Sequence, residues 1–369
     1  MKPAFASLAA FFWACAAPAA EPQLYFPPAK GDWETIAPAK AGWDAGKLNE
    51  ALELAGQRKS SGVVVLHRGR IMAERYWKAD DSPGAKGKDY SLRVKGTDAV
   101  GGAIEDVASV QKSVSAILTG IAQHKGLLRL DDPVHKHLGQ GWSKALLTQE
   151  EEITIRHLLT MTSGLTEDLT FEAPAGKRWR YNSAAYARTM DVVAAAAKKS
   201  ANDLTREWLT GRIGMNDSAW AERPGLGAKG ALNPRGFTTT ARDLARFGLL
   251  ILANGRWQDQ TIIADREFLH DALHPSQELN PSYGYLWWLN GQKEVARGAG
   301  QRAKGPLIPG APPDLVAALG ALDRKVYVVP SLDLVVTRLG NAAGAGFDNE
   351  FWKALSAAAP KPEGRPTSQ

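Results

Sequence analysis

The chain has 369 residues and a formal net charge of +6, and 44% of its residues are hydrophobic and 23% charged. This composition is typical of a globular protein with a large core, and it excludes a disordered or fibrous chain. The basic excess is small for this length and no run of five basic residues occurs, so a dedicated nucleic-acid-binding protein is not expected.

Residues 1–20 have the pattern of a secretory signal peptide. Lys2 precedes an apolar stretch, and the segment ends in Ala-Pro-Ala-Ala with a cleavage site expected near Ala20. We therefore predict an exported protein, either periplasmic or secreted. The alternative is a lipoprotein anchored through Cys15, which the bulky aromatic residues before this cysteine disfavour. Because Cys15 is the one cysteine of the sequence, cleavage near Ala20 leaves a mature chain without disulfides or cysteine-bound zinc.

The first elements after the signal are predicted to be an extended arm, a helix and a hairpin. Residues 21–42 are rich in proline and alanine, which favours the arm. A helix is expected from Asp44, a suitable N-cap, because apolar residues then recur at helical spacing. Residues 62–77 form two apolar runs around a short polar turn and predict a β-hairpin. Residues 78–104 are polar and glycine-rich, which is typical of a long loop.

The middle of the chain is expected to be mostly helical, and strands are expected to return after it. Apolar residues recur at intervals of three and four in four segments, which predict helices at 107–123, 153–161, 184–199 and 243–253. After Pro281 the pattern predicts strands at 283–289, 325–329 and 334–338, and a last helix at 351–359. None of these segments has about 18 uninterrupted apolar residues, so no integral membrane segment is expected in the mature chain.

The element order β, α, β predicts one sheet interrupted by a helical insertion, provided that the two β parts pair. We therefore expect a single α+β domain over residues 21–359, with an α/β lobe formed by about 44–106 and 275–359. The helical lobe is expected at about 107–274. The polar, proline-containing residues 360–369 predict a flexible tail.

The predicted helix at 107–123 carries the strongest chemical signal. Ser109 is the only serine of the chain followed three residues later by a lysine, and Lys112 is the only charged residue of this segment. The two side chains share one helix face, whose other members are small, so the face is expected to pack closely against another element. Desolvation there would lower the pKa of Lys112, and a neutral amine can take the proton of a serine hydroxyl. The alternative is a solvent-facing serine beside a lysine that extends to the surface.

Other motifs of known chemistry are missing or weak. The sequence contains no Gly-x-Ser-x-Gly, no His-Glu-x-x-His and no P-loop. Residues 225–230 fit a dinucleotide-binding glycine pattern, but no strand is expected before them, so we interpret them as a turn. His135 and His137 are two residues apart on a polar turn, and no further ligand is obvious. We therefore expect no metal and no cofactor.

Several segments between Trp43 and Leu355 match motifs of a known family. They are Ser109 to Lys112, residues 126–134, 153–165, the triplet Tyr181-Asn182-Ser183, 243–248 and 283–288. With these motifs the chain resembles the serine β-lactamase and penicillin-binding-protein family, in particular its class C-like branch. That branch also contains esterases and hydrolases of 6-aminohexanoate oligomers. The resemblance implies a β-lactamase-like fold, in which helices flank an antiparallel sheet and a mostly α-helical lobe is inserted.

The resemblance also implies roles for individual residues. Ser109 would be the nucleophile that forms an acyl-enzyme, and Lys112 and Tyr181 would share the general-base and general-acid work. Which of these two activates Ser109 stays open. The backbone N–H groups of Ser109 and Ala321 would form the oxyanion hole.

This sequence departs from the family pattern in two motifs. The second motif ends in Ser183, where much of the family has asparagine, and Ser183 is still expected to bind substrate. The third motif is usually Lys-Thr-Gly or His-x-Gly, and here Gly320 fits but Leu319 stands near the usual cation or histidine. We expect Leu319 and Gly320 to contact substrate, with Trp287 or Trp288 lining an apolar pocket beside Leu319.

We therefore expect an exported serine hydrolase that cleaves a small ester or amide, as a carboxylesterase or an amidase. One alternative is a β-lactamase or D,D-peptidase. An alternative of another class is a non-catalytic module that binds a ligand in a penicillin-binding-like pocket. The basic, glycine- and proline-rich segment 291–314 is expected to border the site, although a plain surface loop fits it equally well. The oligomeric state is left open.

Overall fold

The computed structural model of the protein describes residues 23–79, 94–223, 232–297 and 301–360. The predicted signal peptide with Cys15, the glycine turn at 225–230 and nearly all of the predicted tail lie outside the described residues.

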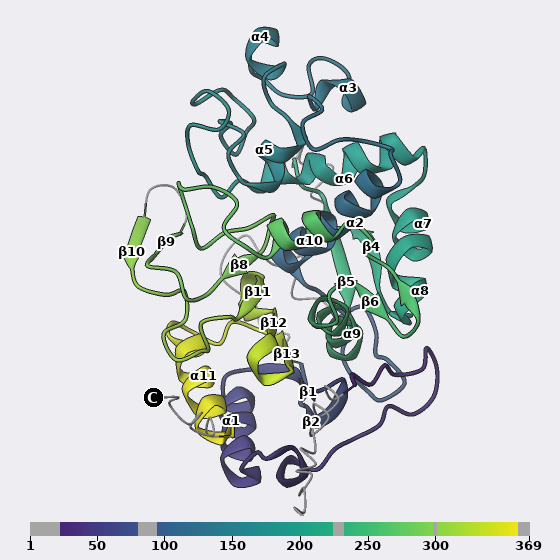
Figure 1. The fold of residues 1–369 in the computed structure, drawn as a ribbon, viewed down its shortest axis with the longest axis vertical. Coiled ribbons are helices and arrows are strands. Elements are labelled where there is room, and N and C mark those ends of the chain that lie inside the picture. Colours follow the sequence, from purple (N-terminus) through teal and green to yellow (C-terminus); the bar gives the residue numbers. More distant parts are fainter. Residues whose placement is uncertain (1–22, 80–93, 224–231, 298–300, 361–369) are drawn as a thin grey trace, which may run out of the picture.

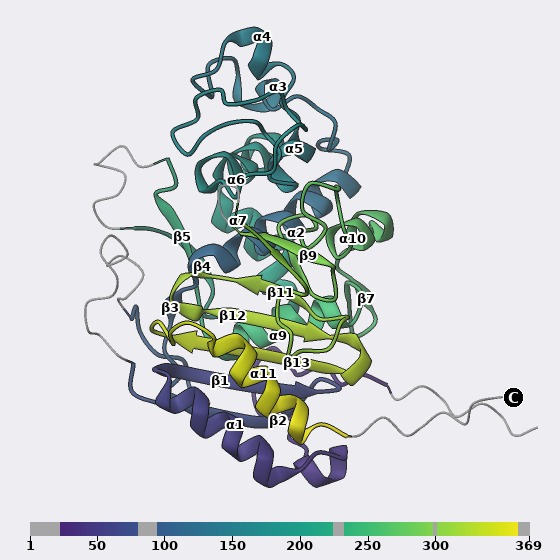
Figure 2. The same ribbon diagram turned by 90° about the vertical axis from the view of Figure 1, so that its left-hand side faces the viewer.

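A six-stranded sheet joins the two β parts of the described chain (Figure 2). Its order is β2-β1-β13-β12-β11-β8, and every pair in it is antiparallel. The central pairing of β1 with β13 confirms that the N-terminal hairpin and the C-terminal strands form one sheet. The strands are β1 (Ser60–His67), β2 (Arg70–Tyr76), β8 (Trp288–Leu289), β11 (Val316–Leu319), β12 (Lys325–Val329) and β13 (Leu334–Gly340).

Helices cover both faces of this sheet (Figure 1). On one face α1 (Ala45–Gln57) packs beside α11 (Phe347–Ala358), and on the other lies α9 (Ala241–Leu252). Helix α1 begins where predicted, because the Asp44 carboxylate accepts the backbone N–H of Lys47 at 3.0 Å. Gly248 lets α9 approach the sheet, since a Cβ atom there would lie 2.5 Å from Val335 of β13.

A mostly helical lobe stands at one end of the sheet, at the top of Figure 1. Its α-helices are α2 (Gln111–His124), α3 (His135–Leu138), α4 (Leu147–Glu150), α5 (Ile155–Leu159), α6 (Ser183–Ala197), α7 (Ala201–Thr205), α8 (Gly211–Ile213) and α10 (Arg266–Ala272). Elsewhere in the described residues, short helical turns are η1 (Pro38–Ala41), η3 (Ala108–Val110), η4 (Arg206–Thr210), η6 (Ala321–Asp323) and η7 (Pro330–Leu332). Short strands complete the described fold: β3 (Glu105–Asp106), β4 (Ala219–Glu222), β5 (Arg235–Thr239), β6 (Arg256–Trp257), β7 (Gln260–Thr261), β9 (Glu294–Arg297) and β10 (Gln301–Lys304).

The small-residue face of α2 packs as the sequence indicated. A Cβ atom on Gly120 would lie 2.3 Å from the ring of Phe268 in α10, so only glycine allows this contact. The Ser113 hydroxyl donates to the carbonyl of Leu286 at 2.7 Å. Helix α2 is buried over most of its length, and it also packs against α6.

Several predicted elements differ from the observed ones; for example, the last helix, expected at 351–359, spans Phe347–Ala358. The helix expected from residue 107 begins as the short turn η3, and α2 follows at Gln111. The strand expected at 283–289 is reduced to β8, because Leu286 has a positive φ of 59° that interrupts extended backbone. The segment 291–314 contains the hairpin β9–β10 where a loop was expected.

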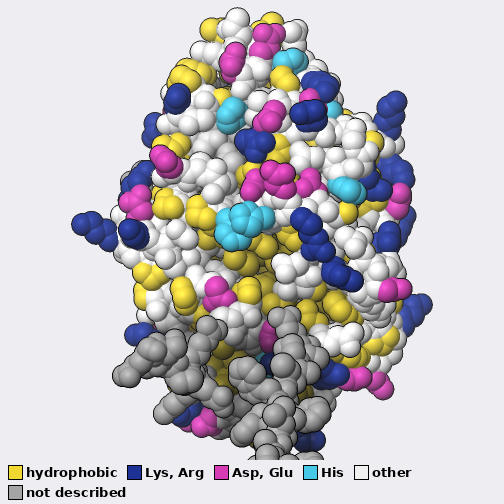
Figure 3. All heavy atoms as spheres, in the orientation of Figure 1, with side chains coloured by type: hydrophobic (Ala, Val, Ile, Leu, Met, Phe, Trp, Pro, Cys, Tyr) yellow, Lys and Arg dark blue, Asp and Glu magenta, His cyan; other side chains and the backbone are white. Residues whose placement is uncertain are grey.

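Charged side chains are interspersed on the face drawn in Figure 3, where basic and acidic groups alternate around a hydrophobic middle. No continuous basic field is visible on that face, in keeping with the small net charge. Among the described residues, none of the helices combines the length and the apolar character needed to cross a bilayer.

Candidate active site

Ser109 lies in the turn η3, at the entrance to α2, and its side chain is partly exposed. The preceding residue, Ala108, has a positive φ of 49°, which is unfavourable for a residue with a Cβ atom. Two contacts hold this turn: Asp106 Oδ1 accepts the N–H of Ala108 at 2.8 Å, and the N–H of Val107 donates to the carbonyl of Phe237 at 2.9 Å. Strands β3 and β5 therefore fix the position of the Ser109 hydroxyl.

Lys112 lies one helical turn after Ser109 and is only 2% exposed. Its Nζ atom is 2.9 Å from Ser109 Oγ and 3.4 Å from Ser183 Oγ. The same nitrogen lies 4.7 Å from the ring centre of Tyr181 and 4.0 Å from that of Tyr186. Burial lowers the pKa of Lys112 from 10.5 to about 7, while the carboxylate of Glu167 opposes this change. A substantial fraction of the amine is therefore neutral near neutral pH.

Tyr181 faces the same hydroxyl from the segment that precedes α6. Burial raises the pKa of its phenol, and a hydrogen bond with Ser109 partly opposes the rise. Tyr181 therefore keeps its proton in the pH range where Lys112 loses one. The Tyr181 ring stacks on Trp288 with centroids 5.8 Å apart, and Tyr283 packs edge-on against both rings.

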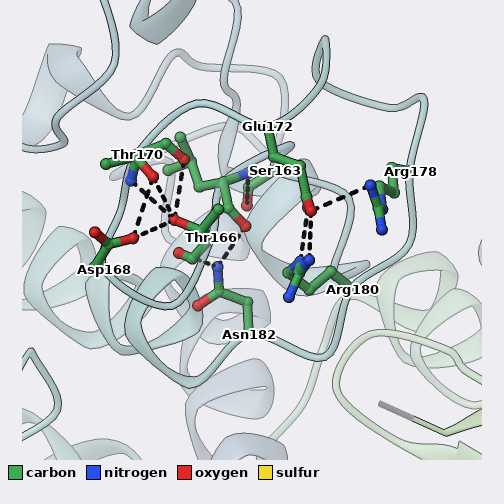
Figure 4. Close-up of polar contacts among 9 residues, drawn as sticks. Ser163, Thr166, Asp168, Thr170, Glu172, Arg178, Arg180 and Asn182 are labelled. Atoms are coloured by element: carbon green, nitrogen blue, oxygen red, sulfur yellow. Dashed lines mark hydrogen bonds and ion pairs between the residues drawn. The ribbon is translucent and has the colours of Figure 1, made fainter. Parts of the chain in front are cut away.

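Asn182 and Ser183 have different roles at the start of α6. Asn182 is the N-cap, and its Oδ1 accepts the N–H groups of Ala184 and Ala185 at 3.0 and 2.9 Å. Its Nδ2 donates to the carbonyls of Leu165 and Thr166 at 2.8 Å each (Figure 4). The polar atoms of Asn182 are thus used to hold the backbone, and Ser183 is the residue of this pair that reaches Lys112.

The segment predicted as the third motif lies beside the turn that carries Ser109. Strand β11 ends at Leu319, and a Cβ atom on Gly320 would lie 2.3 Å from the carbonyl oxygen of Val107. Glycine is therefore required for β11 to approach the Ser109 turn. The N–H of Gly320 donates to the carbonyl of Arg324 at 2.8 Å, and Ala321 begins η6 directly after it. Leu319 is partly exposed at this edge.

The structure separates the two tryptophans that the sequence proposed for the substrate pocket. Trp288 lies with Tyr181, as described above. Trp287 is fully buried and stacks on Phe247 of α9, with ring centroids 5.8 Å apart. Consecutive residues of an extended segment point to opposite sides, so one of the two turns toward the site and the other into the core.

A buried polar network behind the turn was not recognised in the sequence. Arg223 holds both oxygens of the Asp106 carboxylate at 2.7 and 3.0 Å, with side chains only 5% and 3% exposed. Gln111 joins this pair, because its Oε1 accepts from Arg223 at 3.3 Å and from the N–H of Phe237 at 2.9 Å. Beside it, Arg324 pairs with Glu105 at 2.7 Å. An acidic pair directly before an apolar helix was the one signal of this network in the sequence.

The segment 291–314 is fastened next to the aromatic rings of the site. The hydroxyl of Ser282 donates to the carbonyl of Glu294 at 2.7 Å, and Asn280 Nδ2 donates to the carbonyl of Ala296 at 3.2 Å. The basic side chains are partly engaged, since Arg302 pairs with Glu294 at 2.6 Å. A role of this segment at the rim of the site stays a prediction.

The two histidines considered as metal ligands are not brought together with other ligands. His137 lies 3.3 Å from Asp132, which also pairs with Lys136 at 2.7 Å. In the part of the chain that the structure describes, no group of three or more histidine, cysteine, aspartate or glutamate residues is placed to hold a metal ion.

These contacts define a serine site without a histidine: a hydroxyl, a buried amine of lowered pKa and a protonated phenol. The chain belongs to the β-lactamase family, whose model matches residues 40–359. That family consists of serine hydrolases related to penicillin-binding proteins, and the protein has the β-lactamase-like α+β fold.

Three similar proteins illustrate this relationship. An uncharacterized protein of Alkalihalophilus pseudofirmus is 24% identical over 81% of this chain and 88% of its own length. A structure from Bacteroides dorei, provisionally described as a β-lactamase, has a TM-score of 0.63 at 16% identity and covers 86% of this chain and 99% of that one. A Bacillus anthracis protein, provisionally named a 6-aminohexanoate-dimer hydrolase, has a TM-score of 0.58 at 17% identity, over 83% and 80% of the two chains. At these identities the structural likeness establishes the fold alone.

Proposed function

We propose that this protein is an exported serine hydrolase that cleaves small esters or amides through an acyl-enzyme on Ser109. One observation carries the proposal. The Lys112 amine lies 2.9 Å from Ser109 Oγ, and burial brings its pKa to about 7. A lysine in this condition supports general-base catalysis near neutral pH. Export rests on the signal pattern of residues 1–20, which N-terminal sequencing of the protein recovered from outside the cytoplasm tests.

The first half of the proposed reaction uses the lowered pKa of Lys112 and the raised pKa of Tyr181. Neutral Lys112 takes the proton of Ser109 while Oγ forms a bond to the substrate carbonyl carbon. The N–H groups of Ser109 and Ala321 are proposed to receive the oxyanion. When the tetrahedral species collapses, the alcohol or amine leaves with the proton of Tyr181, which Lys112 then restores to the phenol.

The second half of the reaction uses the same groups. Water attacks the ester carbon of the acyl-enzyme and gives a proton to Lys112. The carbon–Oγ bond breaks, the acid product leaves, and Ser109 regains its proton from the lysine. The opposite pKa directions of the two residues favour Lys112 as the base and Tyr181 as the proton donor.

The edge of the site favours uncharged substrates. Leu319 is a partly exposed apolar residue directly before Gly320, where relatives of this family usually place a cation or histidine. Trp288 packs, largely buried, against the ring of Tyr181. The carboxylate of a penicillin would lose water there without gaining a partner, which is costly. We therefore propose small neutral esters as preferred substrates, with amides such as those suggested by the name of the Bacillus anthracis protein as the second class.

A panel of substrates tests the proposed function against its alternatives. Turnover of p-nitrophenyl butyrate, a matched anilide and nitrocefin is compared for the wild type and Ser109→Ala. A higher kcat/KM for nitrocefin than for the ester contradicts the esterase proposal and supports a β-lactamase. Labelling of Ser109 by a fluorophosphonate without turnover of any substrate supports a binding module instead.

Replacing Leu319 by histidine is expected to raise β-lactam turnover relative to ester turnover. A charge-assisted hydrogen bond is worth roughly 1.5–3 kcal/mol, which corresponds to about a ten- to hundredfold gain in binding of the substrate carboxylate. The measurement is the ratio of kcat/KM for nitrocefin to that for p-nitrophenyl butyrate. Leu319→Ala is the matched control, because it removes the apolar side chain without adding a polar group. An equal rise of the ratio in both variants would show that the size of the Leu319 side chain, and not the missing polar group, limits the turnover of β-lactams.

A further inference from the structure

Glu167 lies in a tightly connected loop that leads to the second catalytic motif. The flanking residues hold its backbone, because the N–H of Thr166 donates to the carbonyl of Thr170 at 2.9 Å and the two hydroxyls are 2.7 Å apart. Asp168 accepts a hydrogen bond from the Thr170 hydroxyl at 3.1 Å. Asn182 fastens the loop to the start of α6, and Figure 4 shows these side chains gathered around the Thr166 hydroxyl.

The Glu167 side chain turns from this loop to the first turn of α6. Its two carboxylate oxygens accept the N–H of Ser183 at 2.9 and 3.1 Å, and one of them accepts the N–H of Ala184 at 3.4 Å. Ser183 in turn places its Oγ 3.4 Å from Lys112 Nζ. A single residue thus links the carboxylate with the amine beside the nucleophile.

Few other charges face this amine. Among the described residues, Glu167 and Arg223 are the charged groups that act on Lys112, and Arg223 holds the Asp106 carboxylate with both groups buried. The neighbours from the loop and α6 are the neutral Tyr181, Tyr186 and Ser183. Strand β11 contributes Val-Ala-Ala-Leu, which has no titratable side chain. Glu167 is therefore the acidic group through which the surroundings favour a positive charge at this position.

We propose that Glu167 is a positioning residue of this site: its carboxylate fixes the first turn of α6 and favours the ammonium form of Lys112. The proposal rests on the proposed function, since it assigns Glu167 an effect on the base of that reaction. A base whose protonated form is stabilised accepts the serine proton more readily once it is neutral, but it is neutral only at higher pH. The same carboxylate therefore raises the alkaline plateau of the rate and reduces the rate at acid pH.

The test is the pH profile of kcat/KM for p-nitrophenyl butyrate in Glu167→Gln. Without the carboxylate the pKa of Lys112 falls, so the acid limb of the profile should move to lower pH by roughly half a unit or more. The alkaline plateau should fall at the same time, so that the profiles of the variant and the wild type cross. A uniform loss of activity with an unmoved limb would mean that Glu167 only stabilises the helix, and it would overturn the proposal.

Two control variants distinguish the effect of the Glu167 charge from the loss of any surface charge and from loosening of the loop. Glu151→Gln removes the same charge from an exposed position after α4, and it should leave the limb in place. Asp168→Asn loosens the same loop but keeps Glu167, so it should lower turnover at every pH without moving the limb. A shift of the limb in either control as large as in Glu167→Gln would contradict the assignment.

A direct titration keeps the proposal testable if no substrate is turned over. The Cε resonance of Lys112 is followed by NMR in protein labelled with [ε-13C]lysine, and its signal is assigned by its absence in Lys112→Met. Glu167→Gln should lower the observed pKa of Lys112 relative to the wild type. An unchanged pKa overturns the role of Glu167, whereas a lowered pKa in a protein without hydrolase activity overturns the proposed function and leaves the role of Glu167 intact.

Discussion

Replacing Ser109 by alanine is expected to abolish turnover while the protein stays folded. In the proposed mechanism Ser109 provides the atom that bonds to the substrate, and the residue is partly exposed in a turn that backbone contacts already hold. Loss of a nucleophile of this kind costs on the order of 10⁶ in kcat in a serine hydrolase. The measurement is kcat for p-nitrophenyl butyrate, with the melting temperature as the check on folding.

Ser115→Ala is the matched control for this variant. Ser115 lies on the same helix, and its hydroxyl donates to the carbonyl of Gln111, one turn earlier, at 3.1 Å. Among the described residues, no hydrogen bond joins the Ser115 side chain to Ser109, Lys112 or Tyr181. Turnover of Ser115→Ala should therefore stay close to that of the wild type. If Ser109→Ala kept more than a few per cent of wild-type activity, another nucleophile would have to be sought.

Short-range geometry made the pair of Ser109 and Lys112 predictable from the residues alone, whereas Tyr181 and the third motif were predicted from the family resemblance. Ser109 lies in η3 and Lys112 follows three residues later in the first turn of α2, so helical spacing brings the two side chains together, and Ser109 Oγ and Lys112 Nζ are 2.9 Å apart. One sheet was expected on the condition that the two β parts pair, and the structure meets this condition through β1 and β13, which are buried over their whole length.

Contacts between distant segments were not predictable from one sequence. Arg223 and Asp106 are 117 positions apart, and neither has a local pattern that marks it as half of a buried ion pair. Gly320 was assigned to the third motif by resemblance, but its close approach to Val107 becomes visible only in the fold. Glu167 was passed over for the same reason, since its partner Ser183 lies 16 positions later. Trp287 and Trp288 point to opposite sides of their segment, and the sequence does not indicate which of the two faces the core.

Replacing Lys112 by methionine is expected to remove most activity and at the same time to stabilise the fold at neutral and acid pH. Below about pH 7 the folded protein must hold a buried ammonium, whereas the unfolded chain exposes the same group to water. A pKa that falls from 10.5 to about 7 on folding corresponds to a cost on the order of 5 kcal/mol at acid pH. Methionine fills similar volume without a charge, so this cost disappears in the variant.

The sign of the pH dependence distinguishes this effect from simple repacking. In the wild type the unfolded chain binds more protons than the folded protein between about pH 7 and 10.5, so the contribution of Lys112 to stability rises with pH in this range. The stabilisation by Lys112→Met, measured by urea unfolding, should therefore be largest near pH 6 and shrink towards pH 10.

Lys125→Met, which removes an exposed lysine from the end of the same helix, should show little change at either pH. A gain in Lys112→Met that is equal at both pH values would mean that Lys112 titrates normally in the folded protein, and the assignment of a neutral lysine as base would then fail.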